Sequence, residues 1–277
     1  MYYNIKKINL NHSFIFFFTV NIFSVLIFKF NNINISSILC LFLILTIGVS
    51  HGSLDHVKGK KLLELFNIKH TYLFYLLYIL IALGIIFTWI LFPSITLILF
   101  LIVASYHFGK EDTVFKVKKS LFLNEILFFL KGSSVIIAPL LFQREATYEI
   151  FAILNFYVFE SLFFSNFLLV MFLILSFFSS VYLSLGKPFE LKNIMFLDYF
   201  SIIILNLFLT PILAFTIYFC FLHSVRHSFG LINEMDRSFK KGLKKFVKRA
   251  VPLTLITGLI FLISIYFLNN LYEVDEA

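Results

Sequence analysis

The stretch YLFYLLYILIALGIIFTWILF, residues 72–92, contains no charged side chain and is long enough to cross the hydrocarbon core of a bilayer. The rest of the chain has a similar character, because 60% of its 277 residues are hydrophobic, 14% are charged and the mean hydropathy is +0.96. An ordinary soluble domain is about 45–50% apolar. The composition therefore predicts an integral membrane protein.

Apolar segments of about 17–25 residues are typical of transmembrane helices. The candidates are residues 14–31, 35–54, 72–92, 94–110, 121–142, 163–185, 194–210, 211–230 and 249–270. Pro93 marks a tight turn, and at Pro211 one kinked helix is an alternative to two spans. Residues 146–160 are apolar but short, which indicates an interfacial or re-entrant segment. We expect an all-α, polytopic transmembrane helical bundle of about 8–9 spans, with residues 1–277 forming a single integral membrane domain.

The chain has a net charge of +8, and its basic residues are concentrated in short loops between the apolar segments, such as KVKK at 116–119 and KKGLKKFVKR at 240–249. These basic clusters follow every second span, so all of them can lie on the cytoplasmic side at once. Their expected partners are the anionic headgroups of the lipid bilayer, and no nucleic acid is expected. We therefore predict a multi-pass protein of the cell (inner or plasma) membrane.

Histidines close three of the spans that run from the outside inward: His51, His107, and the pair His223 and His227. In this topology all four lie at one depth, in the inner half of the bilayer. Ionisable side chains in membrane spans are costly and usually face the bundle interior, where they mark functional sites. The pair is four residues apart and shares one helical face, as in other histidine metal sites. We hypothesise a four-histidine metal site near the cytoplasmic ends of the helices.

Two carboxylates follow these histidines at the spacing of one helical turn. Asp55 lies four residues after His51, and Glu111 lies four residues after His107. A metal-bound histidine commonly donates its second N–H to a carboxylate, which makes both residues candidates for orienting the ligands. A solvated helix end near lysines explains them equally well. Imidazoles without thiolates suit iron, copper, zinc or nickel, and the residues alone leave that choice open.

Three segments resemble the histidine motifs of the Brp/Blh family of bacterial and archaeal membrane β-carotene 15,15′-dioxygenases. They are GVSHGSLDH at 48–56, YHFGKED at 106–112 and PILAFTIYFCFLHSVRHS at 211–228, in the family's order. The resemblance implies O2-dependent cleavage of the central double bond of β-carotene, giving two molecules of all-trans-retinal, which can be supplied to a microbial rhodopsin. It also implies a non-haem Fe(2+) centre held by the motif histidines His51, His107, His223 and His227.

The resemblance assigns no ligand role to the other residues of these motifs. His56 is placed outside the set of iron ligands, and Tyr218 and Arg226 are expected to have structural roles beside the site. Ser50 replaces the proline that usually precedes the first motif histidine, which is expected to change only the local bend of the helix.

A proton- or ion-coupled membrane transporter that uses intramembrane His, Asp and Glu is the alternative from a different class. Such transporters often contain repeated halves with interrupted spans in matching positions, and the sequence shows neither feature. Membrane di-iron desaturases use an H-x-x-H-H box, which this chain lacks. Stoichiometric iron in the purified protein would separate an oxygenase from a transporter.

Overall fold

The computed structural model describes residues 2–29, 35–48, 52, 55–68, 70, 72–115, 117, 122–153, 165–236 and 238–271. All regular elements within these residues are helices. Eight of the described helices are long and apolar enough to cross a membrane. The prediction of an all-α, multi-pass membrane protein is therefore confirmed, and the eight spans found among the described residues lie at the lower end of the expected 8–9.

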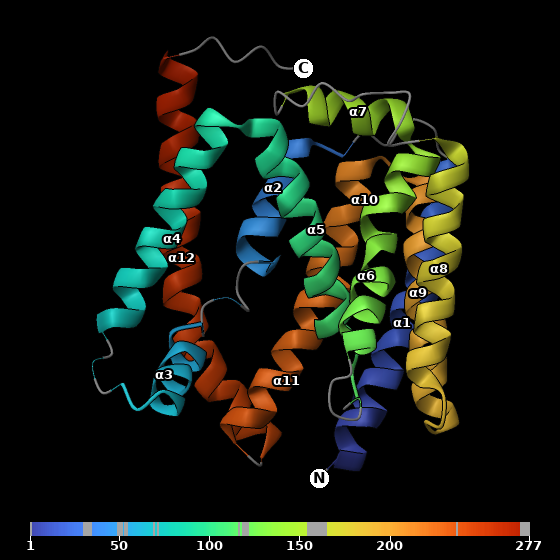
Figure 1. The fold of residues 1–277 in the computed structure, drawn as a ribbon, viewed down its shortest axis with the longest axis horizontal. Coiled ribbons are helices and arrows are strands. Elements are labelled where there is room, and N and C mark those ends of the chain that lie inside the picture. Colours follow the sequence, from blue (N-terminus) through green and yellow to red (C-terminus); the bar gives the residue numbers. More distant parts are fainter. Residues whose placement is uncertain are drawn as a thin grey trace.

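The helices run roughly parallel, with short helices lying across the two ends of the bundle (Figure 1). Their bounds are α1 (Tyr2–Lys29), α2 (Ser37–Leu43), η1 (Ile44–Gly48), α3 (Asp55–Leu65), α4 (Tyr72–Leu91), α5 (Pro93–Glu111), α6 (Phe122–Phe142), α7 (Arg144–Ile153), α8 (Asn166–Ser184), α9 (Phe189–Phe208), α10 (Pro211–Ile217), η3 (Tyr218–Ser224), α11 (Val225–Met235) and α12 (Phe239–Leu271), where η marks a π-helix. The segments α10, η3 and α11 together form one span. The short helix α7 covers part of the segment that was expected to be interfacial, and it lies across the end of the bundle (Figure 1).

Two prolines separate consecutive spans, as expected. Helix α4 ends at Leu91 and α5 begins at Pro93, while α9 ends at Phe208 and α10 begins at Pro211. Proline is favoured in the first turn of a helix because its missing N–H has no partner there in any case. The alternative of a single kinked helix through Pro211 is therefore wrong.

The first span begins earlier than predicted. The apolar segment was expected to start at residue 14, yet α1 begins at Tyr2 and its candidate membrane span begins at Lys6. A search for apolar segments detects only the part of a helix that lies in hydrocarbon. The helix itself extends further, because its backbone groups are paired with one another along its whole length. His12, which precedes the predicted start, therefore lies within this span.

The second predicted span, residues 35–54, is only partly accounted for. Within its described part, α2 and η1 cover Ser37–Gly48, a piece too short to cross a bilayer alone. The next helix, α3, lies at the end of the bundle that carries the N-terminus (Figure 1). Residues 49–51 and 53–54, which include His51, lie outside the described residues.

A close backbone contact between α5 and α6 positions one of the histidine-bearing helices. A Cβ atom at Gly109 would lie 1.7 Å from the carbonyl oxygen of Phe128, and one at Gly132 would lie 1.9 Å from that of Ser105. Only glycine permits such an approach, and small residues favour close helix packing in membranes. The contact holds the last turns of α5, which contain His107, against α6.

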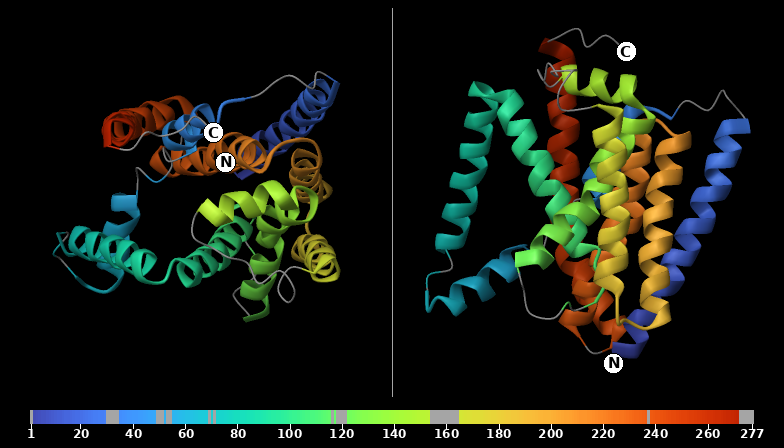
Figure 2. Two further views of the ribbon diagram at one scale, coloured as in Figure 1. Left: turned by 90° about the horizontal axis from the view of Figure 1, so that it is seen from above. Right: turned by 45° about the vertical axis from the view of Figure 1, so that its right-hand side comes forward.

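The helices differ in how much of their surface is covered. Helix α6 has buried residues from Leu127 to Leu140, whereas α4 has none. Figure 2 shows α4 standing at the edge of the bundle. Its exposed apolar surface is that of a lipid-facing helix, because large apolar side chains need no protein cover in hydrocarbon.

The lysine-rich segments lie at one end of the bundle, which we call the basic end. It contains the start of α1, helix α3, the connection between α8 and α9, and the start of α12 (Figure 1). The last described turns of α12 lie at the opposite end (Figure 1). This is the arrangement of basic loops that the sequence predicts.

Candidate active site

The span that carries His223 and His227 is not a regular α-helix at the level of the candidate site. Tyr218–Ser224 is π-helical, with hydrogen bonds between residues five apart. In such a segment residues five apart stack on one face, whereas in an α-helix residues three or four apart do so. Tyr218 and His223 therefore point to the same side, and π-helical segments are frequent at functional sites.

Both side chains bind the carboxylate of Asp112, which caps the C-terminus of α5. The Tyr218 hydroxyl donates to Oδ2 at 2.6 Å, and His223 Nδ1 lies 2.8 Å from Oδ1. Tyr218 is 2% exposed, His223 1% and Asp112 7%, so the contact is sealed from the surroundings.

The electrostatic surroundings of Asp112 favour the charged carboxylate. Burial alone would raise its pKa, but His223, Lys131 and Arg226 together hold the pKa below its ordinary value. An ionised acceptor makes Nδ1 the protonated ring nitrogen of His223. Nε2 is then the nitrogen through which His223 could bind a metal.

Two further imidazoles approach His223 near the basic end. The ring centroid of His223 is 5.3 Å from that of His107 on α5 and 6.5 Å from that of His227 on α11. His227 Nδ1 lies 3.0 Å from Oε2 of Glu111, and its Nε2 lies 3.3 Å from Nζ of Lys58. His107 is exposed whereas His223 is buried, so the cluster opens on the side of His107.

The structure brings part of the predicted set of site residues together. Three of the four histidines, His107, His223 and His227, come together, and His51 lies outside the described residues. Glu111 pairs with His227 across two helices, a different partner from the one expected from its spacing.

Asp55, the other predicted carboxylate, is the first residue of α3 at the basic end. Burial raises its pKa, and the nearby Lys58, His227 and His107 act in the opposite direction. The expected pairing of Asp55 with His51 stays a prediction, because His51 is not among the described residues.

Among the described residues, no group of three or more His, Cys, Asp or Glu side chains is arranged to hold a metal ion. The donor chemistry nevertheless fits one. Two of the three imidazoles, His223 and His227, have a carboxylate at Nδ1, which is the usual environment of a metal-bound histidine. Lys58 lies beside Nε2 of His227, and a metal bound there would displace its ammonium group.

Asp112 is the residue near the site that the spacing argument missed. It is the last residue of the YHFGKED motif, directly after Glu111. A search for carboxylates one turn from His107 passes over it, because it lies five residues away and binds a histidine on another helix. The adjacent acidic pair in the motif is the signal that could have pointed to it.

Arg226 ties the histidine-bearing span to two other helices. Its guanidinium donates to both carboxylate oxygens of Asp198 on α9, and Nη2 also donates to the Ser13 hydroxyl on α1 at 2.8 Å. The Ser13 hydroxyl in turn donates to Asp198 at 3.0 Å. This paired, fork-shaped contact is strong and directional, which fits the structural role expected for Arg226.

Comparison with known proteins identifies the family. The model of the family described as β-carotene 15,15′-dioxygenase matches residues 42–277. The chain belongs to the β-carotene 15,15′-dioxygenase family. A curated β-carotene 15,15′-dioxygenase of an uncultured marine bacterium, 66A03, is 28% identical over 244 residues, which cover 85% of this chain and 83% of that protein. No solved structure matches the chain.

Membership of the β-carotene 15,15′-dioxygenase family makes the protein a carotenoid-cleaving enzyme. The matched residues contain all four predicted histidines as well as Asp112. They exclude α1, although α1 packs along α9 and contributes Ser13 to the Arg226 network. In addition, His12 of α1 donates from Nε2 to the carbonyl oxygen of Phe221 at 2.9 Å, so the helix also supports the π-helical segment.

Proposed function

We propose that the protein cleaves the central double bond of β-carotene with O2 and releases two molecules of all-trans-retinal. The proposed centre is non-haem Fe(2+), held by His51, His107, His223 and His227. The observation that carries the proposal is the meeting of His107, His223 and His227, from two separate spans, in a chain of the β-carotene 15,15′-dioxygenase family. Family membership favours this reaction over the transporter.

Iron suits the proposed donor set because imidazole is a common ligand of iron, and a metal held by only four side chains can have positions open for small molecules. The free cysteines Cys40 and Cys220 are buried, and neither is part of the histidine cluster. When bound, the iron would supply a coordination position for O2 and the redox chemistry of oxygen activation.

The polar residues around the histidines would hold the ligands in place. Asp112 accepts from Nδ1 of His223, and Glu111 pairs with Nδ1 of His227, so each ring presents its other nitrogen to the centre. Tyr218 holds Asp112 from the other oxygen and prevents the carboxylate from turning away. The chain's task in this arrangement is to fix ring orientation before a ligand arrives.

Aromatic side chains supply an apolar wall beside the histidines. The rings of Phe108 and Phe219 lie 5.0 Å and 5.6 Å from that of His223, and Phe215 stacks on Phe219 at 5.3 Å. A polyene has no polar handle, so an apolar wall orients it by shape and excludes water that would support competing reactions.

The surroundings of the site suit a hydrocarbon substrate. β-Carotene partitions into the bilayer, and the exposed side of the cluster at His107 offers lateral entry without extraction into water. We place the basic end on the cytoplasmic side of the cell membrane, following the distribution of lysines. The whole chain would act as a single membrane domain, and its retinal would be supplied to a microbial rhodopsin.

The test is expression in a bacterial host that accumulates β-carotene, followed by chromatography of the extracted pigments. Wild-type protein is compared with His51→Ala, His107→Ala, His223→Ala and His227→Ala. His70→Ala is the matched control, because His70 is exposed and lies in the connection between α3 and α4. We expect retinal to replace β-carotene in the wild type and the control, and β-carotene to persist in the four variants.

Two results would contradict the proposal. Persistence of β-carotene with wild-type protein that is inserted in the membrane and loaded with iron would exclude the reaction. Retinal formation by any one of the four variants at the wild-type rate would remove that histidine from the proposed ligand set.

A further inference from the structure

A buried lysine, Lys131, lines the same small cavity as Asp112. Lys131 on α6 is 8% exposed. Its ammonium donates to the carbonyl oxygen of Gly109 at 3.2 Å and to the hydroxyl of Thr113 at 3.0 Å. These two acceptors flank Asp112 in the chain, so Lys131 holds the end of α5 on which Asp112 sits.

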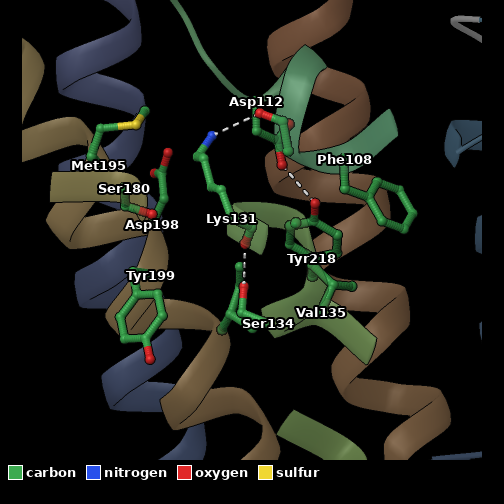
Figure 3. A pocket seen from close by; sticks show the side chains of 13 residues that line it. Phe108, Asp112, Lys131, Ser134, Val135, Ser180, Met195, Asp198, Tyr199 and Tyr218 are labelled. Carbon is green, nitrogen blue, oxygen red and sulfur yellow. Dashed lines mark hydrogen bonds between the residues drawn. The ribbon is translucent and has the colours of Figure 1, made fainter. Parts of the chain in front are cut away.

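The charged groups around Lys131 indicate that it helps to offset the negative charge of Asp112. Its charged neighbours are the carboxylates of Asp112 and Asp198 and the guanidinium of Arg226. Figure 3 shows its side chain extending between the two aspartates. Arg226 is already engaged with both oxygens of Asp198. Lys131 therefore contributes more than Arg226 to offsetting the charge of Asp112, and an uncompensated charge at this depth would be costly.

The space beside these groups is too small for substrate. The cavity lined by Asp112, Lys131, Asp198 and Tyr218 has a volume of about 20 Å³ (Figure 3). This is about the space of one water molecule and far below that of any part of a carotenoid. Any influence of Lys131 on the reaction must therefore pass through the end of α5 that it holds, where Asp112 lies.

We propose that Lys131 is a positioning residue for His223 that acts through Asp112. The ammonium group fixes the end of α5 and supplies the charge that keeps the Asp112 carboxylate beside Nδ1 of His223. Partners of this kind typically change metal affinity about 10–100-fold when they are removed. The inference rests on the proposed function, because only there is His223 an iron ligand.

The experiment measures binding of Fe(2+) to the purified full-length protein under anaerobic conditions, with Co(2+) absorption as a second readout of histidine ligation. Lys131→Met removes the charge and keeps an unbranched side chain of similar length. We expect it to bind Fe(2+) about tenfold more weakly than the wild type and to alter the Co(2+) spectrum. Thr113→Val is a milder variant that removes one acceptor of the ammonium group, and we expect a smaller weakening in the same direction.

Ser176→Ala is the matched control. The Ser176 hydroxyl on α8 donates to the backbone oxygen of Lys131 at 2.8 Å and is fully buried, so its loss disturbs the same residue without touching the ammonium group. We expect lower thermal stability with unchanged Fe(2+) affinity.

The outcomes separate the two proposals. Wild-type affinity in Lys131→Met, or equal weakening in Lys131→Met and Ser176→Ala, would overturn the role of Lys131 and leave the proposed function standing. If Lys131→Met does not fold, unchanged affinity in Thr113→Val decides against the role. Wild-type protein that binds no Fe(2+) would overturn the proposed function, and this inference with it.

Discussion

Tyr218 and His223, five residues apart on one span, bind the two oxygens of a single carboxylate on another span. In an α-helix five residues turn the chain about 140° beyond a full turn, which would direct the two side chains to different faces. The π-helical segment reduces this difference, because its turn contains more residues. The pairing thus depends on a local change of helix type as much as on the residues themselves.

Asp112→Asn should weaken Fe(2+) binding about 10–100-fold and reduce carotene cleavage accordingly, because the neutral amide is a poorer acceptor for Nδ1 of His223. Iron titration of purified protein measures the first effect. Glu125→Gln is the control, since Glu125 also lies near the end of α5 but contacts Lys110 and Tyr106 instead of the histidines. Equal iron affinity in Asp112→Asn and wild type would show that Asp112 does not orient His223.

Tyr218→Phe should reduce the free energy of unfolding by about 1.5–3 kcal/mol, because a hydrogen bond to a charged acceptor is lost. Iron binding should fall less than in Asp112→Asn, since the contact between His223 and Asp112 remains. Tyr199→Phe removes a bond to the neutral carbonyl oxygen of Leu173 and should cost about 0.5–1.5 kcal/mol. Unfolding in detergent measures both, and a larger loss in Tyr199→Phe would contradict the charged character of the Asp112 contact.

Gly109→Ala should destabilise the protein by at least about 3 kcal/mol, because the new Cβ would overlap the backbone of α6 and force the helices apart. Gly84→Ala should be nearly neutral, since a Cβ on the lipid-facing helix α4 meets nothing within 4 Å. Membrane levels of the folded protein and retinal yield in the carotene host report the difference. Normal accumulation and activity of Gly109→Ala would mean that α5 and α6 do not pack this closely.

Arg226→Met should lower the free energy of unfolding by about 3–5 kcal/mol, because it leaves the Asp198 carboxylate buried without its partner. Combining it with Asp198→Asn should recover much of the loss, since no unpaired charge then remains. A double-mutant cycle on the unfolding free energy measures the coupling. Additive effects of the two substitutions would show that the ion pair is not formed.

Much of the membrane fold could be predicted from the sequence because hydrocarbon imposes a simple length requirement. Segments such as 72–92 and 121–142 match helices closely, and the turns at Pro93 and Pro211 were recognisable from proline chemistry. The start of α1 could not be predicted in this way, because its first turns contain polar residues such as Lys6 and His12 and do not form an apolar segment.

The sequence by itself determined the class of the protein, most of the spans, and the placing of His107, His223 and His227 at a common level, since these follow from apolar length, loop charge and helical repeat. Only the tertiary structure decided that Asp112 binds His223, that Glu111 pairs with His227, and that Lys131 binds the end of α5 beside Asp112. Spacing along one helix identifies neighbours on that helix alone. Contacts between helices depend on packing, on the close approach at Gly109 and on the π-helical turn, none of which has a periodic signal in the sequence.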